Sequence, residues 1–212
     1  MITVYGEGRG FRVAWLLEEL GLPYRLRPVD VLDSGGDAEF LAVNPAGFIP
    51  AIVDGEVTMV ESIAILEYLL ARHGPSPLAP PAHDPAFPAY QQFLHLGEAG
   101  LAGPINAVIA THILGPEAEW DNCTTRWARR TFESRRGLVA RQLARSPYMA
   151  GEAFTAADIS VTYALQLAER TGNAVPTEAE RAYLARTTGR AAYGRAMDSC
   201  AATKAWVAAM AG

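Results

Sequence analysis

The feature that most constrains the fold of this chain is the dipeptide Asp54-Gly55, which separates two short runs of β-favouring residues. Asp-Gly readily adopts the positive φ angles that a two-residue hairpin turn requires. Residues 51–53 and 57–60 are therefore expected to pair as antiparallel strands. A turn precedes them at Asn44-Pro45-Ala46-Gly47, because Pro fixes φ and Gly accepts a positive φ. Apolar residues then recur at helical spacing over residues 63–70, so a helix follows the hairpin.

Two features of this stretch suggest chemistry beyond folding. Pro50 opens a strand, where it cannot donate a ladder hydrogen bond. If the bond between Ile49 and Pro50 is cis, the backbone N–H and C=O of Ile49 turn outward and can face a ligand. Glu61 and Ser62 stand at a helix start, where unpaired N–H groups and the Ser62 hydroxyl attract a carboxylate. A helix cap without any ligand also explains Ser62.

The N-terminal stretch predicts a strand, a helix and a second strand. Residues 2–5 are typical of a short buried strand, and the glycine-rich residues 6–10 form a loop after it. This loop lacks the GxGxxG spacing of a dinucleotide-binding turn, so no such site is predicted. Residues 13–20 indicate an amphipathic helix that ends at Gly21, and residues 24–31 a second strand. With the hairpin and helix that follow, this order is expected of a thioredoxin-like domain.

The remainder of the chain is predicted to be helical. Residues 74–88 read GPSPLAPPAHDPAFP, a proline density that excludes a helix and predicts a semi-rigid linker. Beyond it we expect one long helix over residues 89–114, bent at Pro104, and another over residues 116–145. A later helix begins at Thr155-Ala156-Ala157-Asp158, where the Asp carboxylate can reach back to the Thr N–H in a capping box.

Composition and charge exclude several classes of function. The 212-residue chain has a net charge of −5 and a single lysine, Lys204, which argues against nucleic-acid binding. Its two cysteines, Cys123 and Cys200, form no CxxC pair, so neither a disulfide framework nor a metal site is predicted. Neither a run of about 18 apolar residues nor a basic leader occurs, so we expect a cytoplasmic protein that does not enter a membrane.

Three motifs occur in order and with matching gaps over residues 44–69: NPxGxIPA, the Asp-Gly hairpin and ESxAIxxYL. Together they resemble the glutathione-binding half of the thioredoxin-like domain in cytosolic glutathione transferases. Residues 147–159 resemble the signature of that family's all-α domain, so the resemblance covers essentially the whole chain. It implies an α/β thioredoxin-like domain (βαβ-ββα) over residues 1–74, a linker over residues 75–88 and an all-α helical-bundle domain over residues 89–212.

The resemblance also implies ligands and partners. Glutathione is the expected co-substrate, without a metal, a hydrophobic electrophile is the second substrate, and the chain forms a homodimer. Ile49 is expected to pair through its backbone with the cysteinyl part of glutathione, next to a cis Pro50 and the neighbouring Phe48. Glu61 and Ser62 are expected to hold the γ-glutamyl end. The electrophile would lie between the domains, where the candidate lining residues are Tyr90, Phe93, Leu94, Pro104, Asn106 and His112.

The group that activates the thiol departs from the family's usual pattern. The thiolate is the nucleophile, so an enzyme must lower a thiol pKa that is ordinarily about 8.5. Members with a Ser or Cys after the first strand read S/C-x-x-x-R, but alignment on Arg12 places Gly8 at that position. Tyr5 and Arg9 are therefore the catalytic candidates. A strand-end tyrosine is also explained as a core residue, whereas Arg9 at a helix start is favourable if an anion such as the thiolate binds there.

The first hypothesis is a glutathione transferase that conjugates the glutathione thiolate to electrophilic hydrophobic small molecules. The missing hydroxyl keeps open a second one, a non-catalytic or weakly catalytic glutathione-binding protein of the same fold. A third is a glutathione-dependent reductase or isomerase, although the Cys- or Ser-rich active loop usual for such enzymes does not occur here.

Overall fold

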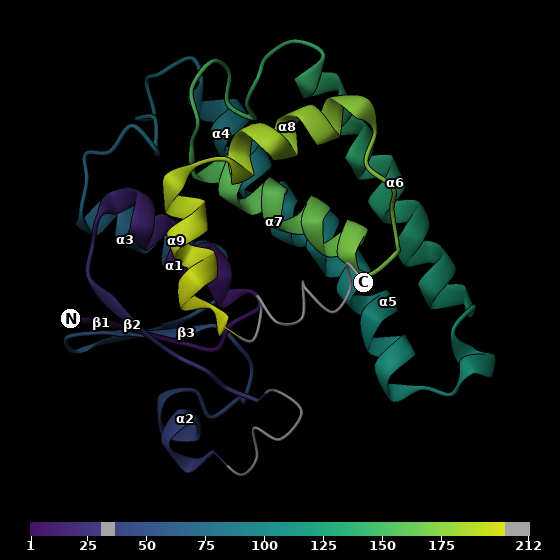
Figure 1. Cartoon of the computed structure of the whole chain (residues 1–212), viewed down its shortest axis with the longest axis horizontal. Helices are drawn as coiled ribbons and strands as arrows, with labels where there is room; N and C mark the ends of the chain where they lie inside the picture. Colours follow the sequence, from purple (N-terminus) through teal and green to yellow (C-terminus); the bar gives the residue numbers. More distant parts are fainter. Residues whose placement is uncertain (31–36, 202–212) are drawn as a thin grey trace. The chain divides into compact units, whose positions relative to one another are not determined.

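The computed structural model describes residues 1–30 and 37–201, which form two compact units (Figure 1). The first unit combines residues up to Pro75 with residues 189–201, and the second comprises Ser76–Thr188. The division into domains 1–74 and 89–212 stays a prediction, because the units group the chain differently near its C-terminal end.

A four-stranded mixed sheet forms the centre of the first unit. Its strands are β1 (Ile2–Tyr5), β2 (Tyr24–Arg27), β3 (Ala51–Asp54) and β4 (Val57–Val60), in the order β2-β1-β3-β4. β1 pairs parallel with β2 and antiparallel with β3, and β3 pairs antiparallel with β4. The predicted hairpin is confirmed, with Gly55 at φ +62° in its turn. The prediction of a strand over residues 24–31 was wrong from residue 28, because Pro28 has no N–H to continue the ladder, and residue 31 lies outside the described residues.

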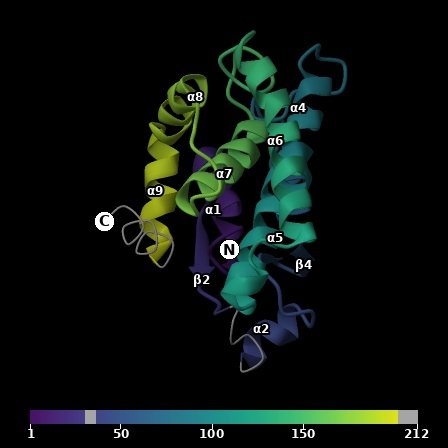
Figure 2. The same cartoon turned by 90° about the vertical axis from the view of Figure 1, so that its right-hand side faces the viewer.

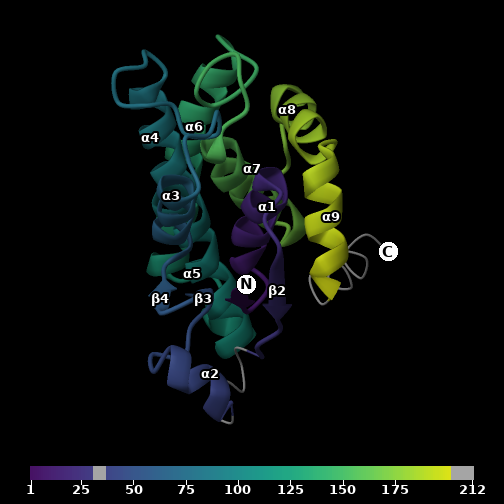
Figure 3. The ribbon, with the colours of Figure 1, turned by 90° about the vertical axis from the view of Figure 1, so that its left-hand side faces the viewer.

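Two helices cover one face of this sheet and a short helix covers the other. α1 (Gly10–Leu20) and α3 (Ser62–Arg72) lie together on one side, and α2 (Ala38–Val43) lies on the opposite side (Figures 1 and 3). α1 ends at Gly21, as predicted, and this glycine has φ +65°. We did not predict α2. Its N-cap is Asp37, whose carboxylate accepts from the Phe40 N–H at 2.9 Å.

The last described helix, α9 (Ala191–Ser199), belongs to the first unit and packs against α1 (Figure 3). The Tyr193 ring stands edge-on to Trp15, with the ring centroids 4.9 Å apart, and Trp15 is fully buried. Two ion pairs flank this aromatic contact: Arg190 contacts Glu19 and Arg195 contacts Glu18, each at 2.6 Å.

The elements of secondary structure in the second unit are helical, apart from an isolated β-bridge between Tyr148 and Gly151. Its elements are α4 (Phe87–His95), the π-helical η2 (Leu96–Ala102), α5 (Gly103–Leu114), the 3₁₀ turn η3 (Glu117–Glu119), α6 (Cys123–Leu143), α7 (Ala156–Arg170) and α8 (Glu178–Thr188). α5 and α6 run side by side, as Figures 1 and 2 show.

One prediction for the helices of this unit needs refinement, and another was wrong. The long helix over residues 89–114 changes to a π register before Pro104, where the Gly103 N–H bonds the Glu98 carbonyl. Pro104 has no N–H to donate and lies in the first turn of α5. The helix predicted from residue 116 begins only at Cys123, because Asn122 caps it by accepting from the N–H groups of the next turn.

One helical stretch of the described chain, Phe87–Leu114, is long and apolar enough to cross a membrane. Half of its most apolar window is buried inside the structure, and a core helix of a helical unit has the same length and composition.

The predicted capping box of α7 is present and lies within a larger buried network. The Asp158 carboxylate is fully buried and accepts from the Thr155 N–H at 2.8 Å. It also accepts from the Met149 N–H at 2.8 Å and from the Tyr183 hydroxyl at 3.0 Å. Burial raises the pKa of Asp158 to about 6, although these hydrogen bonds favour the carboxylate.

Candidate functional site

The turn before β3 is organised by the side chain of Asn44, which is 4% exposed. Its amide donates to the Phe48 carbonyl at 2.7 Å, and its Oδ1 accepts from the Ala46 N–H at 3.1 Å. These bonds fix the path of the chain into Phe48, whose side chain is 39% exposed. Asn44 was predicted only as a turn residue, although an Asn that starts a turn commonly bonds the backbone just after it.

Ile49 and Pro50 follow this turn, and the peptide bond between them is cis. Pro50 is buried, whereas Ile49 is partly exposed. Within the described residues, the backbone of Ile49 makes no hydrogen bond to another part of the chain. Its N–H and C=O are thus not used by the ladder, which begins at Ala51.

The loop between β1 and α1 lies against this segment. A Cβ placed on Gly6, which has φ +83°, would come within 2.3 Å of an Ile49 side-chain carbon, so only glycine fits there. A Cβ on Gly8 would lie 3.6 Å from the end of the Ile49 side chain, and one on Gly10 would lie 3.5 Å from Pro50. The start of α1 therefore lies beside Ile49 and Pro50.

Glu61 and Ser62 form the start of α3. Glu61 is exposed and has φ +71° and ψ 107°, which makes it the only residue other than glycine with positive φ in the described chain. Such a backbone costs of order 1–3 kcal/mol and persists where the surrounding structure imposes it. Ser62 is 3% exposed and is the first residue of the helix.

Arg12, which lies in α1, contacts Ser62 from the other side. Arg12 is fully buried, and its Nη1 donates to the Ser62 Oγ at 3.2 Å. The two residues are 50 positions apart in the sequence, and no local pattern predicts that they meet. One segment, residues 6–12, thus contacts both Ile49 and Ser62.

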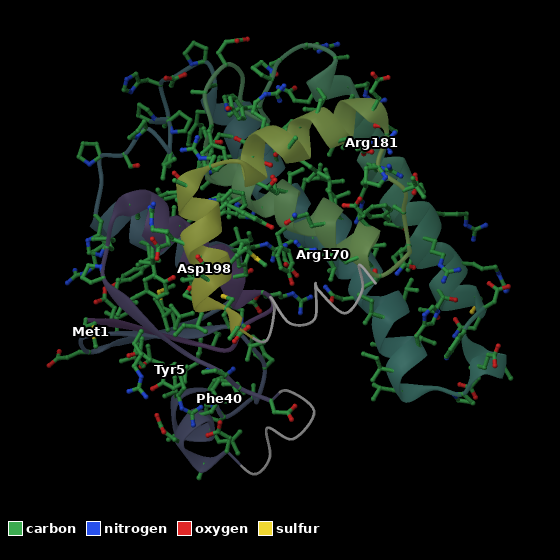
Figure 4. The ribbon with its side chains drawn as sticks, in the orientation of Figure 1. Met1, Tyr5, Phe40, Arg170, Arg181 and Asp198 are labelled. Atoms are coloured by element: carbon green, nitrogen blue, oxygen red, sulfur yellow. The ribbon has the colours of Figure 1, made fainter. Side chains whose placement is uncertain are left out.

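The two catalytic candidates, Arg9 and Tyr5, lie in different surroundings. Arg9 is the N-cap residue of α1, is partly buried and adjoins Gly8, which has φ +61°. Tyr5 is 8% exposed, and its ring stacks on Phe40 of α2 with 6.2 Å between the centroids (Figure 4). Because strand residues alternate between faces, Val4 points toward α1 and Tyr5 toward α2.

The other candidate groups are mostly used by the fold. The candidates Tyr90, Phe93, Leu94 and Pro104 are buried. Asn106 donates to the Ala102 carbonyl at 2.7 Å, and His112 packs its ring against Trp120. Among residues 1–30 and 37–201, three or more His, Cys, Asp or Glu side chains nowhere gather in an arrangement that could hold a metal ion.

Comparisons with known proteins agree with this arrangement. The family model for the N-terminal domain of glutathione S-transferase matches residues 10–77. Glutathione S-transferase 3 of Schizosaccharomyces pombe is 31% identical over 176 residues, which cover 76% of this chain and 71% of that protein. Glutathione S-transferase GstB of Escherichia coli is 27% identical over 168 residues, which cover 76% of this chain and 80% of that protein.

A solved structure extends the likeness over nearly the whole chain. The glutathione transferase URE2P6 from Phanerochaete chrysosporium, in complex with oxidized glutathione, matches with a TM-score of 0.80 at 23% identity. The match covers 94% of this chain and 96% of that one, and it confirms the predicted fold class of a thioredoxin-like domain followed by a helical domain. Together with the sequence relatives, it shows that this chain belongs to the glutathione S-transferase family.

Proposed function

We propose that this protein is a glutathione transferase that joins the sulfur of glutathione to electrophilic hydrophobic small molecules. The observation that carries the proposal is the position of residues 6–12, which touch Ile49 on one side and Ser62 on the other. A small peptide bound along Ile49 and the start of α3 would therefore hold its thiol near the start of α1. Family membership supports the same reading.

Each residue of this site has a distinct role in the proposal. The unused N–H and C=O of Ile49 pair with the cysteinyl backbone, while Phe48 and Pro50 flank that contact. Glu61 and Ser62 bind the γ-glutamyl end. The thiolate lies at the start of α1, where the positive end of the helix dipole and the Arg9 guanidinium favour negative charge. The thiolate attacks an electrophilic carbon, a C–S bond forms, and a leaving group such as chloride departs with the electron pair.

The absence of a side chain at Gly8 favours a second candidate, a protein that binds glutathione and performs little chemistry. Gly8 has φ +61° and offers neither a hydroxyl nor a thiol to the bound sulfur. Two assays separate the candidates: retention on immobilised glutathione, and turnover of a chloronitroarene with glutathione. Retention with turnover supports the transferase, and retention without turnover supports the binding protein. Failure of both means that the site does not accept glutathione.

A glutathione-dependent reductase is supported less well, because such chemistry usually needs a reactive thiol in the site. Cys200, in the first unit, is fully buried, and burial together with the charge of Glu7 raises the pKa of its thiol to about 12. This thiol is therefore protonated at neutral pH and does not act as a nucleophile. Cys123, the other cysteine, is exposed in the second unit.

The proposed partners also include a second copy of the chain. A homodimer remains an expectation from the family resemblance, and sedimentation of the purified protein at micromolar concentration tests it.

A further inference from the structure

We propose that Arg12 is a positioning residue, which aims the Ser62 hydroxyl at the carboxylate of the γ-glutamyl group. This inference rests on the proposed function, because it requires glutathione at the start of α3. Arg12 acts through Ser62 and through its charge, without touching the reacting sulfur.

The geometry of the Arg12–Ser62 pair determines which way the hydroxyl can donate. A guanidinium only donates hydrogen bonds, so the Ser62 Oγ accepts from Arg12 through one lone pair. The single hydrogen of that hydroxyl is then free to point to an acceptor on another side. A serine without this neighbour could rotate its hydroxyl among several directions. Arg12 therefore reduces the entropy that is lost when a ligand fixes this hydroxyl.

The backbone at the start of α3 offers further donors. The first hydrogen bond of the helix runs from the Ile65 N–H to the Glu61 carbonyl at 2.9 Å. The N–H groups of residues 62–64 come before it and have no acceptor within the helix. These groups and the Ser62 hydroxyl belong to the same turn and suit a single anion.

The charged groups around this turn favour the γ-glutamyl carboxylate as the group that binds there. Arg12 is fully buried and always protonated, so the Ser62 hydroxyl lies next to a positively charged group. The exposed Glu61 lies next to Ser62 and carries the opposite charge. A positive and a negative group side by side match the carboxylate and ammonium of a γ-glutamyl head, whereas the glycyl end of glutathione carries a carboxylate alone.

The test compares two ligands on the full-length protein. The first is glutathione, and the second is the tripeptide in which 4-aminobutyrate replaces the γ-glutamyl group, so that only this carboxylate is missing. We expect Arg12→Met to weaken glutathione binding by roughly 10- to 100-fold, the range for a charge-assisted hydrogen bond. Binding of the analogue should change by less than about twofold, since the group that Arg12 serves is absent.

Further variants separate positioning from a general structural role. Ser62→Ala should show the same dependence on the ligand, and the double variant should lose less than the two single losses combined. Arg12→Lys keeps the charge and should restore part of the discrimination between the ligands. Arg72→Met removes a more exposed cation of the same unit and should change neither affinity.

Each outcome of this test is decisive. Equal weakening of both ligands by the Arg12 variants would show that Arg12 only supports the fold, and this would overturn the inference. If Arg12→Met does not fold, as thermal unfolding would show, the same comparison on Arg12→Lys and Ser62→Ala decides. If the unmodified protein fails to bind glutathione, the proposed function itself is wrong, which is a different result from bound glutathione without discrimination.

Discussion

Glu61 combines a strained backbone with a position at the proposed glutathione site. Its φ of +71° favours glycine, yet the chain has a glutamate there. Strained residues cluster at functional sites, because the surrounding structure can hold a side chain where a ligand needs it. Replacing Glu61 by glycine should thus change the stability of the fold and the affinity for glutathione in opposite directions.

Glu61→Gly is expected to raise the free energy of unfolding by about 1 kcal/mol and to weaken glutathione binding. The strain of about 1–3 kcal/mol disappears, while the added freedom of glycine in the unfolded chain costs about 0.5–1 kcal/mol. Urea denaturation and calorimetric titration measure the two quantities. Glu56→Gly is the matched control, because Glu56 is exposed in the hairpin without a positive φ and its loss should leave binding unchanged. Lower stability of Glu61→Gly would show that the backbone at this position is not strained.

The group that activates the thiol can also be tested by single substitutions. Tyr5→Phe should leave the thiol pKa of bound glutathione nearly unchanged, because the Tyr5 ring packs on Phe40 toward α2. Arg9→Gln should raise that pKa, because it removes a positive charge at the start of α1. Ultraviolet titration of the thiolate in the complex measures both. A large upward shift for Tyr5→Phe would identify Tyr5 as the activator.

At the scale of secondary-structure elements, the contribution of a helix cap to stability depends on how deeply the capping side chain is buried. Asn122 and Asp158 each satisfy N–H groups at a helix start. Asn122 is partly exposed, so water can replace its bonds. Asp158 is fully buried and also accepts from Met149 and Tyr183, so its loss leaves several buried donors without their acceptor.

Asp158→Ala is therefore expected to lower the free energy of unfolding by about 3–5 kcal/mol, the range for breaking a buried charged network. Asn122→Ala should cost about 1 kcal/mol, as for an ordinary helix cap. Denaturant melts of the two variants, followed by circular dichroism, test the difference. Equal losses for both variants would mean that the contacts of Asp158 with Met149 and Tyr183 contribute nothing.

At the scale of the whole molecule, the chain returns with α9, its last described helix, to the unit in which it began. α9 supplies Tyr193 to an aromatic cluster with Trp15 and Phe11 of α1, and both partners in α1 are buried. The flanking ion pair between Arg195 and Glu18 is more accessible, with 55% of the Arg195 side chain exposed. Apolar packing should therefore hold α9 in place more firmly than charge.

Tyr193→Ala is expected to cost about 3–5 kcal/mol, the range for removing a large aromatic side chain from a core. Arg195→Ala should cost less than about 1 kcal/mol. Amide hydrogen exchange adds a local measurement, since Tyr193→Ala should speed exchange in α1 more than in α7. Unchanged protection of α1 would mean that α9 does not stabilise it.

The sequence by itself determined the features that arise within a few residues. The Asp54-Gly55 hairpin, the end of α1 at Gly21 and the capping box at Thr155 each follow from the local preferences of a short segment. The errors in the helices are local as well. Asn122 and Asp37 are ordinary N-cap residues, so a search for such caps would have found the true start of α6 and the existence of α2.

Only the tertiary structure decided which distant residues meet. Arg12 and Ser62 are 50 positions apart, and their contact depends on α1 and α3 packing on the same face of the sheet. The place of Tyr5 follows from strand alternation combined with the position of α2, and α9 joins the first unit through its packing on Trp15. Such contacts arise from burial of apolar surface, which is non-directional and does not specify partners in the sequence. The motifs of the chain indicate glutathione, whereas the proposal for how its γ-glutamyl end is held depends on the packing of α1 on α3.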